Sequence, residues 1–193
     1  RNMYANIKRY SEKDIEKLLT KELGERYSSY REKWNNISYS SILKYPLHID
    51  FEVNDKCNQA CIMCPRNTKT HPDINYELNT GSVLDYEKYM EIIDEGVNKG
   101  LLSINLGAFG EPLINKNVFN MVKYAHEEGV IDSRLITNGL LLDKYIDDIF
   151  DSGLVNLFVS IDTFSEEKYL EIRGKGFKKV KNNILGMIEE KKR

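Results

Sequence analysis

After about residue 46 the sequence alternates between the period of a β-strand and the period of an α-helix. Apolar and polar side chains alternate, as in a strand, in segments 48–53, 102–107, 134–138 and 155–162. Apolar side chains at helical spacing follow each of these, in segments that begin at Tyr86, Val118, Tyr145 and Phe177. This order predicts a parallel sheet whose strands are joined by crossover helices.

One face of each predicted strand carries polar groups. In "HIDFEV", for example, Ile49, Phe51 and Val53 alternate with polar side chains. A parallel sheet that helices cover on both sides is usually apolar on both faces. A polar face therefore favours an α/β barrel or half-barrel with a site inside it, and in such folds the chemistry lies at the carboxyl ends of the strands.

The first 45 residues have a different pattern. Ser11 and Asp14 form a capping box ahead of apolar residues at helical spacing, and Gly24 is expected to separate a first helix from a second. We expect residues 1–45 to form a helical extension and residues 46–193 to form the main domain. The extension either packs on that domain or serves as an arm that binds a partner or grips substrate.

All three cysteines of the chain lie in "CNQACIMCPR", residues 57–66. An odd number of thiols cannot all pair within the chain, and no apolar run is long enough for a secretory or membrane-spanning segment. Both observations favour a reducing cytoplasm and thiolates that bind a metal. A net charge of −2 gives no electrostatic reason to expect binding to nucleic acid or to an anionic membrane.

Two kinds of metal site suit these thiols. A structural zinc site needs four ligands, which His71 would complete, but paired CxxC knuckles are absent from the sequence. An iron–sulfur cluster held by three thiolates leaves one iron open for a substrate or cofactor. A non-catalytic zinc or iron–sulfur module that acts through protein contacts is thus an alternative to an enzyme.

Further unusual residues follow the other predicted strands. The second strand is followed by "GAFGEPL", the third by "TNG" and the fourth by "SID", with "IRG" further on. Because the carboxyl ends of parallel strands meet at one rim, all these motifs are expected to gather around the cysteines.

Together these motifs resemble the radical S-adenosylmethionine (radical SAM) enzymes. The resemblance rests on "CNQACIMCPR", "AFGEPL", "ITNGLLL", "DSGLVNLFVSID" and "YLEIRGKGFKKVKNNI", in this order, and covers residues 45–192. It is greatest for the branch that often carries a C-terminal SPASM or twitch domain with auxiliary clusters. It implies a partial (β/α) barrel of which this chain holds about four βα units, fewer than the family has, so a truncated barrel is expected.

The resemblance also implies the cofactors and their ligands. Cys57, Cys61 and Cys64 would bind three irons of a [4Fe-4S] cluster, and the amino and carboxylate groups of S-adenosylmethionine would chelate the fourth. The residues expected to contact S-adenosylmethionine are Met63, Gly110, Glu111, Pro112, Asn138, Ser160 and Arg173.

Each of these contacts has a physical reason. The carboxylate of Glu111 suits the amino group of the cofactor, and Arg173 suits its carboxylate. Gly110 allows the backbone to approach the cofactor closely, and Ser160 is placed to bind its ribose or carboxylate. Met63 stands where the family usually has an aromatic residue beside the adenine, and a thioether also packs on aromatic rings. Phe109 replaces the first glycine of the family's GGEP turn.

The function that the resemblance implies is reductive cleavage of S-adenosylmethionine to a 5'-deoxyadenosyl radical, which takes a hydrogen atom from a substrate. The substrate would be a peptide or protein, a sugar or lipid precursor, or a small metabolite, and the electron would come from a reductant such as flavodoxin or ferredoxin. No residue is singled out as catalytic, since the cofactors carry the chemistry.

Overall fold

The structure is a computed structural model, and it describes residues 11–192 except 39, 68 and 71–79. The chain forms two compact units, residues 1–43 and residues 44–193. The division into domains 1–45 and 46–193 proposed from the sequence stays a prediction, because compactness alone does not define a domain. His71, the fourth ligand of the zinc alternative, lies outside the described residues.

The N-terminal unit contains helices α1 (Glu12–Leu23) and α2 (Glu25–Asn35). The expected capping box is present, since the hydroxyl of Ser11 accepts from the Asp14 amide at 3.2 Å and the Asp14 carboxylate accepts from the Ser11 amide at 2.9 Å. Gly24, with φ 74°, separates the two helices as expected. Arg31 of α2 donates to Glu16 of α1 at 3.3 Å and joins them.

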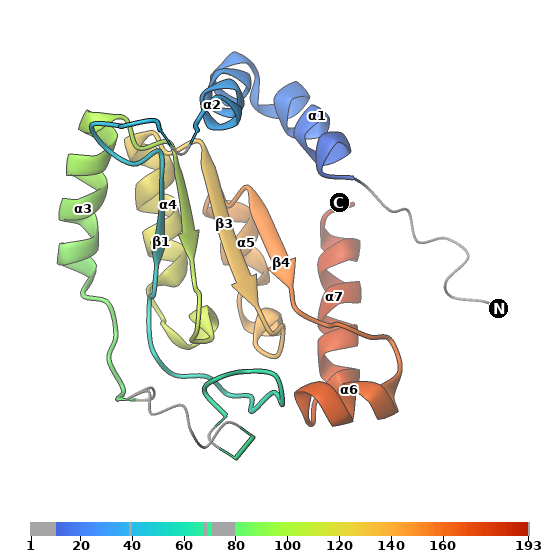
Figure 1. The fold of residues 1–193 in the computed structure, drawn as a ribbon. Coiled ribbons are helices and arrows are strands. Elements are labelled where there is room, and N and C mark those ends of the chain that lie inside the picture. Colours follow the sequence, from blue (N-terminus) through green and yellow to red (C-terminus); the bar gives the residue numbers. More distant parts are fainter. Residues whose placement is uncertain (1–10, 39, 68, 71–79, 193) are drawn as a thin grey trace. The chain divides into compact units, whose positions relative to one another are not determined.

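The C-terminal unit is built on a four-stranded parallel sheet in the order β1 (His48–Phe51), β2 (Ser103–Leu106), β3 (Asp132–Thr137) and β4 (Asn156–Val159), as Figure 1 shows. All four strands fall where the sequence predicts them, although β3 begins two residues earlier than its apolar pattern. The α/β fold with successive βα units is therefore confirmed.

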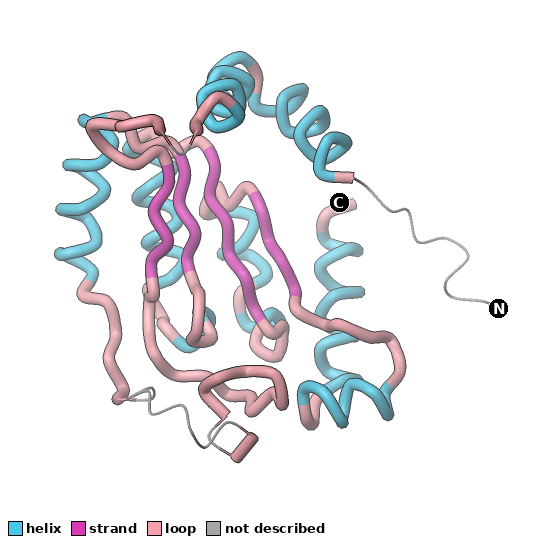
Figure 2. The backbone as a smooth tube through the Cα atoms, in the orientation of Figure 1, coloured by secondary structure: helices cyan, strands magenta, loops and turns pink. Residues whose placement is uncertain are grey.

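Helices α3 (Tyr86–Lys99), α4 (Val118–Glu128) and α5 (Ile146–Asp151) connect the strands, and α7 (Phe177–Glu190) follows β4 (Figure 2). Short 3₁₀ turns at Pro112–Ile114 and Leu142–Lys144 follow β2 and β3. No helical stripe predicts α6 (Glu166–Arg173), because Tyr169 is its one buried side chain, although Arg173–Gly174 has the form of a helix C-terminus with a glycine cap.

The two faces of the sheet differ in burial. Ile104, Leu106 and Leu135 are fully buried in a core that includes Ile93 of α3 and Met121 of α4. On the opposite face, which we call the open face, Asp50, Arg134, Ile136 and Phe158 are exposed. The parallel register places Asp50, Asn105, Arg134 and Asn156 in one row across this face.

No helix within the described ranges combines the length and apolar character that crossing a membrane requires.

Adjacent residues of β3 test this asymmetry. Replacing Leu135 by Ala removes side-chain atoms from the closed core and should cost about 2–5 kcal/mol in the free energy of unfolding. Ile136→Ala, one residue along on the open face, should cost much less. Urea denaturation of both variants measures the difference, and equal losses would mean that both faces of β3 are packed.

Candidate functional site

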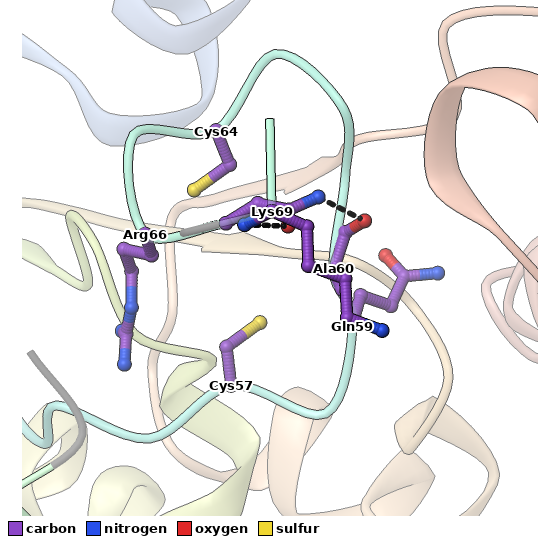
Figure 3. Close-up of a pocket in the computed structure, with 7 residues that line it drawn as sticks. Cys57, Gln59, Ala60, Cys64, Arg66 and Lys69 are labelled. Atoms are coloured by element: carbon purple, nitrogen blue, oxygen red, sulfur yellow. Dashed lines mark hydrogen bonds between the residues drawn. The ribbon is translucent and has the colours of Figure 1, made fainter. Parts of the chain in front are cut away.

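The segment that contains the cysteines leaves β1 and lies at the carboxyl ends of the strands (Figure 1). Cys57, Cys61 and Cys64 are all free thiols. Cys57 and Cys64 line a cavity of about 510 Å³, together with Gln59, Ala60, Arg66, Asn67 and Lys69. Figure 3 shows both sulfur atoms directed into the space that this loop encloses.

The chemistry of these donors suits an iron–sulfur cluster, because three thiols on one short loop are the ligand set for three irons. Cys61, however, does not line the cavity. Among the described residues, no three His, Cys, Asp or Glu side chains converge closely enough to hold a metal ion as they stand. A [4Fe-4S] cluster does not need such convergence, because each of its three thiolates binds a different iron.

Burial affects the ionisation of two of the thiols. It raises the pKa of Cys57 above its ordinary value, and nearby Arg66 acts in the opposite direction. It likewise raises the pKa of Cys61, where Arg173 opposes the shift. The raised pKa values favour the protonated forms of Cys57 and Cys61, whose protons iron must displace on binding.

Helix α6 anchors one side of the cysteine loop. The amide of Ile62 donates to the carbonyl of Ile172 at 3.0 Å, and the Gln59 side chain donates to the hydroxyl of Tyr169 at 2.9 Å. The Nη1 atom of Arg173 lies 3.8 Å from the sulfur of Cys61. Helix α6 therefore provides three of the loop's contacts.

Arg173 also forms an ion pair with Asp162, a residue of the "SID" motif to which the sequence assigned no role. Asp162 has a φ of 57°, the left-handed region that few residues other than glycine adopt, at the point where the chain leaves β4. The Asp162 carboxylate holds the guanidinium beside Cys61. Contact of Arg173 with S-adenosylmethionine stays a prediction, and Asp162 is the residue that would orient it.

Glu111 is 2% exposed, and its carboxylate is bound within the protein. One oxygen accepts from the Leu113 amide at 3.2 Å and from the Thr137 hydroxyl at 2.6 Å, and the other accepts from the Asn138 amide at 2.7 Å. Burial raises the pKa of Glu111, and these three hydrogen bonds oppose the shift. Glu111 thus joins the ends of β2 and β3, a role that the sequence did not suggest. Its pairing with the cofactor's amino group stays a prediction.

Asn138 connects this carboxylate to the cysteine loop. Its side-chain amide donates to Asn58 at 2.6 Å and lies 4.0 Å from the sulfur of Cys57. Its side-chain oxygen accepts from the Leu140 amide at 3.0 Å. The structure therefore brings Asn138, which the sequence placed in the cofactor site, next to the first cysteine.

The structure adds a packing reason for glycine at position 110, and its close approach to the cofactor stays a prediction. Its φ is not in the left-handed region, but a Cβ atom there would lie 2.0 Å from the carbonyl oxygen of Asn54. Close packing against the chain that leads to Cys57 thus requires glycine at this position. Pro112 is buried at the start of the following 3₁₀ turn.

The other two expected contact residues are more exposed. Met63 is half exposed in the cysteine loop. Ser160 is partly buried, and its backbone amide donates to the carbonyl of Thr137 at 2.8 Å. Both lie at the same end of the strands as the cysteines, and their contacts with a cofactor stay predictions.

His48 belongs to a serine–histidine–aspartate grouping, which the sequence did not reveal. Its Nδ1 lies 2.8 Å from the hydroxyl of Ser103, and its Nε2 lies 3.4 Å from Asp50. Ser103 is 2% exposed and begins β2, at the opposite end of the strand from the cysteines. The grouping therefore joins β1 to β2 and does not present a nucleophile.

A family model for the radical SAM superfamily matches residues 51–191, which is most of the chain. The chain belongs to the radical SAM superfamily. This is a family of enzymes, and its members use a [4Fe-4S] cluster and S-adenosylmethionine.

Curated relatives are about 30% identical to this chain over the segments that align with it. The chain is 32% identical over 127 residues to the GTP 3',8-cyclase of Thermodesulfovibrio yellowstonii, covering 65% of this chain and 38% of that protein. It is 32% identical over 155 residues to the GTP 3',8-cyclase of Alkaliphilus metalliredigens, and this match covers 75% of this chain and 45% of that protein. The chain thus spans less than half the length of these relatives.

The fold is similar to that of SuiB from Streptococcus suis. The structure of SuiB bound to S-adenosylmethionine superposes with a TM-score of 0.62 at 18% identity, covering 95% of this chain and 39% of that one. The structure of SuiB bound to its precursor peptide SuiA gives a TM-score of 0.64 at 17% identity, and the match covers 98% of this chain and 39% of that one. At such identities the likeness establishes the fold alone, and it agrees with the expected radical SAM type.

Replacing Glu111 by Gln tests its structural role. The amide group of Gln would face an N–H or O–H donor and leave it without an acceptor, so the free energy of unfolding should fall by about 1.5–3 kcal/mol. Glu128→Gln, on the exposed surface of α4, is the matched control and should change little. Urea denaturation measures both, and an unchanged midpoint for Glu111→Gln would mean that the buried carboxylate does not hold the strand ends.

Proposed function

We propose that this chain is the part of a radical SAM enzyme that binds the cluster and S-adenosylmethionine. One observation carries the proposal: the loop that contains the three thiols is held at the carboxyl ends of the strands by the Glu111 turn, by Asn138 and by α6. Each of these elements also carries a residue expected to contact the cofactor, and the membership of the family supports the same reading.

The proposal assigns each residue a task. When bound, the reduced cluster supplies the electron that cleaves S-adenosylmethionine to the 5'-deoxyadenosyl radical. Cys57, Cys61 and Cys64 hold the cluster, and Arg173, oriented by Asp162, binds the cofactor's carboxylate. Glu111, Gly110 and Pro112 form the turn beside its methionyl part, and Met63, Asn138 and Ser160 surround the rest.

We propose that the substrate lies over the open face of the sheet. There the guanidinium of Arg134 lies 5.1 Å from the centre of the Phe158 ring, and both side chains are exposed. A guanidinium fixed over an aromatic ring suits an anionic group next to a planar one. The curated relatives are named for GTP, which has both, so a nucleotide is the substrate class best supported. Peptide and sugar substrates remain the alternatives.

Other parts of the expected function stay predictions. The relatives' names give no support for a SPASM or twitch domain with auxiliary clusters. A flavodoxin or ferredoxin as reductant and a cytoplasmic location are also predictions. The alternative of a non-catalytic zinc or iron–sulfur module has less support, because the family consists of enzymes.

Removing one thiol tests the cluster. Replacing Cys57, Cys61 or Cys64 by Ala should abolish formation of 5'-deoxyadenosine from S-adenosylmethionine, because the cluster then lacks one of three protein ligands. Iron and sulfide content, absorbance and 5'-deoxyadenosine are measured after anaerobic reconstitution and reduction. Ala60→Ser, in the same loop, removes no thiolate and should behave as wild type. Full cleavage by the triple Ala variant would contradict the proposal, and bound zinc in a colourless wild-type protein would favour the non-catalytic alternative.

Replacing Arg134 by Gln tests the substrate class. The change removes the cation from the open face and should weaken GTP binding about tenfold or more, the loss typical of a charged hydrogen bond, with the affinity for S-adenosylmethionine unchanged. Calorimetry measures both affinities, and Lys123→Gln on the exposed surface of α4 is the control. GTP that binds the variant as well as wild type would exclude Arg134 as the anion-binding residue. A wild-type protein that does not bind GTP would favour the other substrate classes.

A further inference from the structure

Residues 109–111, which form the turn before Pro112, are held by the segment that joins β1 to Cys57. The carboxylate of Glu52 accepts from two successive amides of this turn, from Phe109 at 2.6 Å and from Gly110 at 3.0 Å. Each oxygen of the carboxylate takes one of the two N–H groups. Glu52 immediately follows β1 and lies five residues before Cys57.

The next residue of the turn, Glu111, is bound through its backbone. Its amide donates to the carbonyl of Lys56 at 2.7 Å, and its carbonyl accepts from the side chain of Asn54 at 2.9 Å. The side-chain oxygen of Asn54 accepts in turn from the Lys56 amide at 2.8 Å. Four backbone groups on three consecutive residues of the turn are therefore fixed by Glu52, Asn54 and Lys56, and we call this set of contacts the clasp.

The turn also packs tightly against the segment that contains Glu52 and Asn54, and this packing leaves no room for a side chain at Gly110. A Cβ atom on Gly110 would lie 2.0 Å from the carbonyl oxygen of Asn54 and 3.0 Å from the carboxylate of Glu52. The turn is thus in direct contact with the chain that leads to the first cysteine, and a shift of the turn would break hydrogen bonds on both sides.

Glu52 differs from the other members of the clasp. Two successive backbone N–H groups that point the same way form a binding place for an anion, and here the chain itself provides that anion. Hydrogen bonds to a charged carboxylate are stronger than those to a neutral amide. The side chain of Glu52 is exposed, so it contributes little to the core, and its contacts are with the turn.

We propose that Glu52 is a positioning residue, which fixes the Gly110–Pro112 turn relative to Cys57 so that both meet the same molecule of S-adenosylmethionine. This inference rests on the proposed function. The cofactor is expected to contact both the turn and the cluster, and Glu52 would fix the distance between these two. Glu52 would thus act through the turn, without touching the cofactor.

Three variants separate this role from a general effect on folding. Glu52→Gln keeps one acceptor oxygen but turns an NH₂ group toward the second amide, and Glu52→Ala removes both acceptors. Glu127→Gln, on the exposed surface of α4, is the matched control. The measurements are hydrogen exchange at the Phe109 and Gly110 amides, the iron and sulfide content, the midpoint of thermal unfolding, and the affinity of the cluster-loaded protein for S-adenosylmethionine.

We expect exchange at the two amides to accelerate in the order wild type, Glu52→Gln, Glu52→Ala. The affinity for S-adenosylmethionine should fall in the same order, by about tenfold or more in Glu52→Ala, the loss that corresponds to one charged hydrogen bond. Cluster content and the unfolding midpoint should not change, and the control should match wild type in every measurement.

Wild-type affinity in Glu52→Ala would overturn the inference, as would an equal loss in the control. If Glu52→Ala does not fold, Glu52→Gln decides by the same measurements. Failure of the proposed function has a different signature: the wild-type protein would then bind neither cluster nor S-adenosylmethionine, while exchange at Phe109 and Gly110 would still report whether the clasp exists.

Discussion

The buried carboxylate of Glu111 is the constraint on which the candidate site depends. Glu111 is 2% exposed, and burying a carboxylate costs free energy of folding unless hydrogen-bond donors surround it. Its donors are Leu113, Thr137 and Asn138. Two of them are backbone amides, so the loops after β2 and β3 must adopt these conformations to supply them. The ends of the two strands are thereby fixed together, and the positions of Asn138 and Gly110 follow.

The cysteine loop, by contrast, is held mainly by polar contacts at its edges. Asn58 binds Asn138, Gln59 binds Tyr169, and Ile62 binds the backbone of α6. The larger core cluster of the unit includes no residue of this loop, and a smaller cluster lies beside it around Tyr169 of α6. The three thiols are thus positioned largely by hydrogen bonds that the segment after β3 and helix α6 supply to this loop.

The sequence predicted the elements whose own side chains carry the signal. Period-two alternation located β1 to β4, and helical stripes located α3, α4, α5 and α7. No such stripe located α6, because it packs on the cysteine loop through Tyr169 and backbone groups. Apart from Leu113, the partners of Glu111 and Glu52 were missed because they lie 26 to 58 residues away in sequence, and only the parallel register brings them to the same rim.

On the open face of the sheet, polar side chains form hydrogen bonds between neighbouring strands. Asp50 accepts from Asn105 at 2.7 Å, and Asp132 accepts from Asn156 at 2.8 Å, each from the neighbouring strand. These carboxylates are thus satisfied by amides and stabilise the pairing of strands. Among the described residues, Arg134 forms no ion pair with them and lies instead over the Phe158 ring. Asp50 also lies 3.4 Å from His48, so both carboxylates have partners other than Arg134. This arrangement leaves the guanidinium on the exposed face of the sheet, which supports the proposed anionic substrate there.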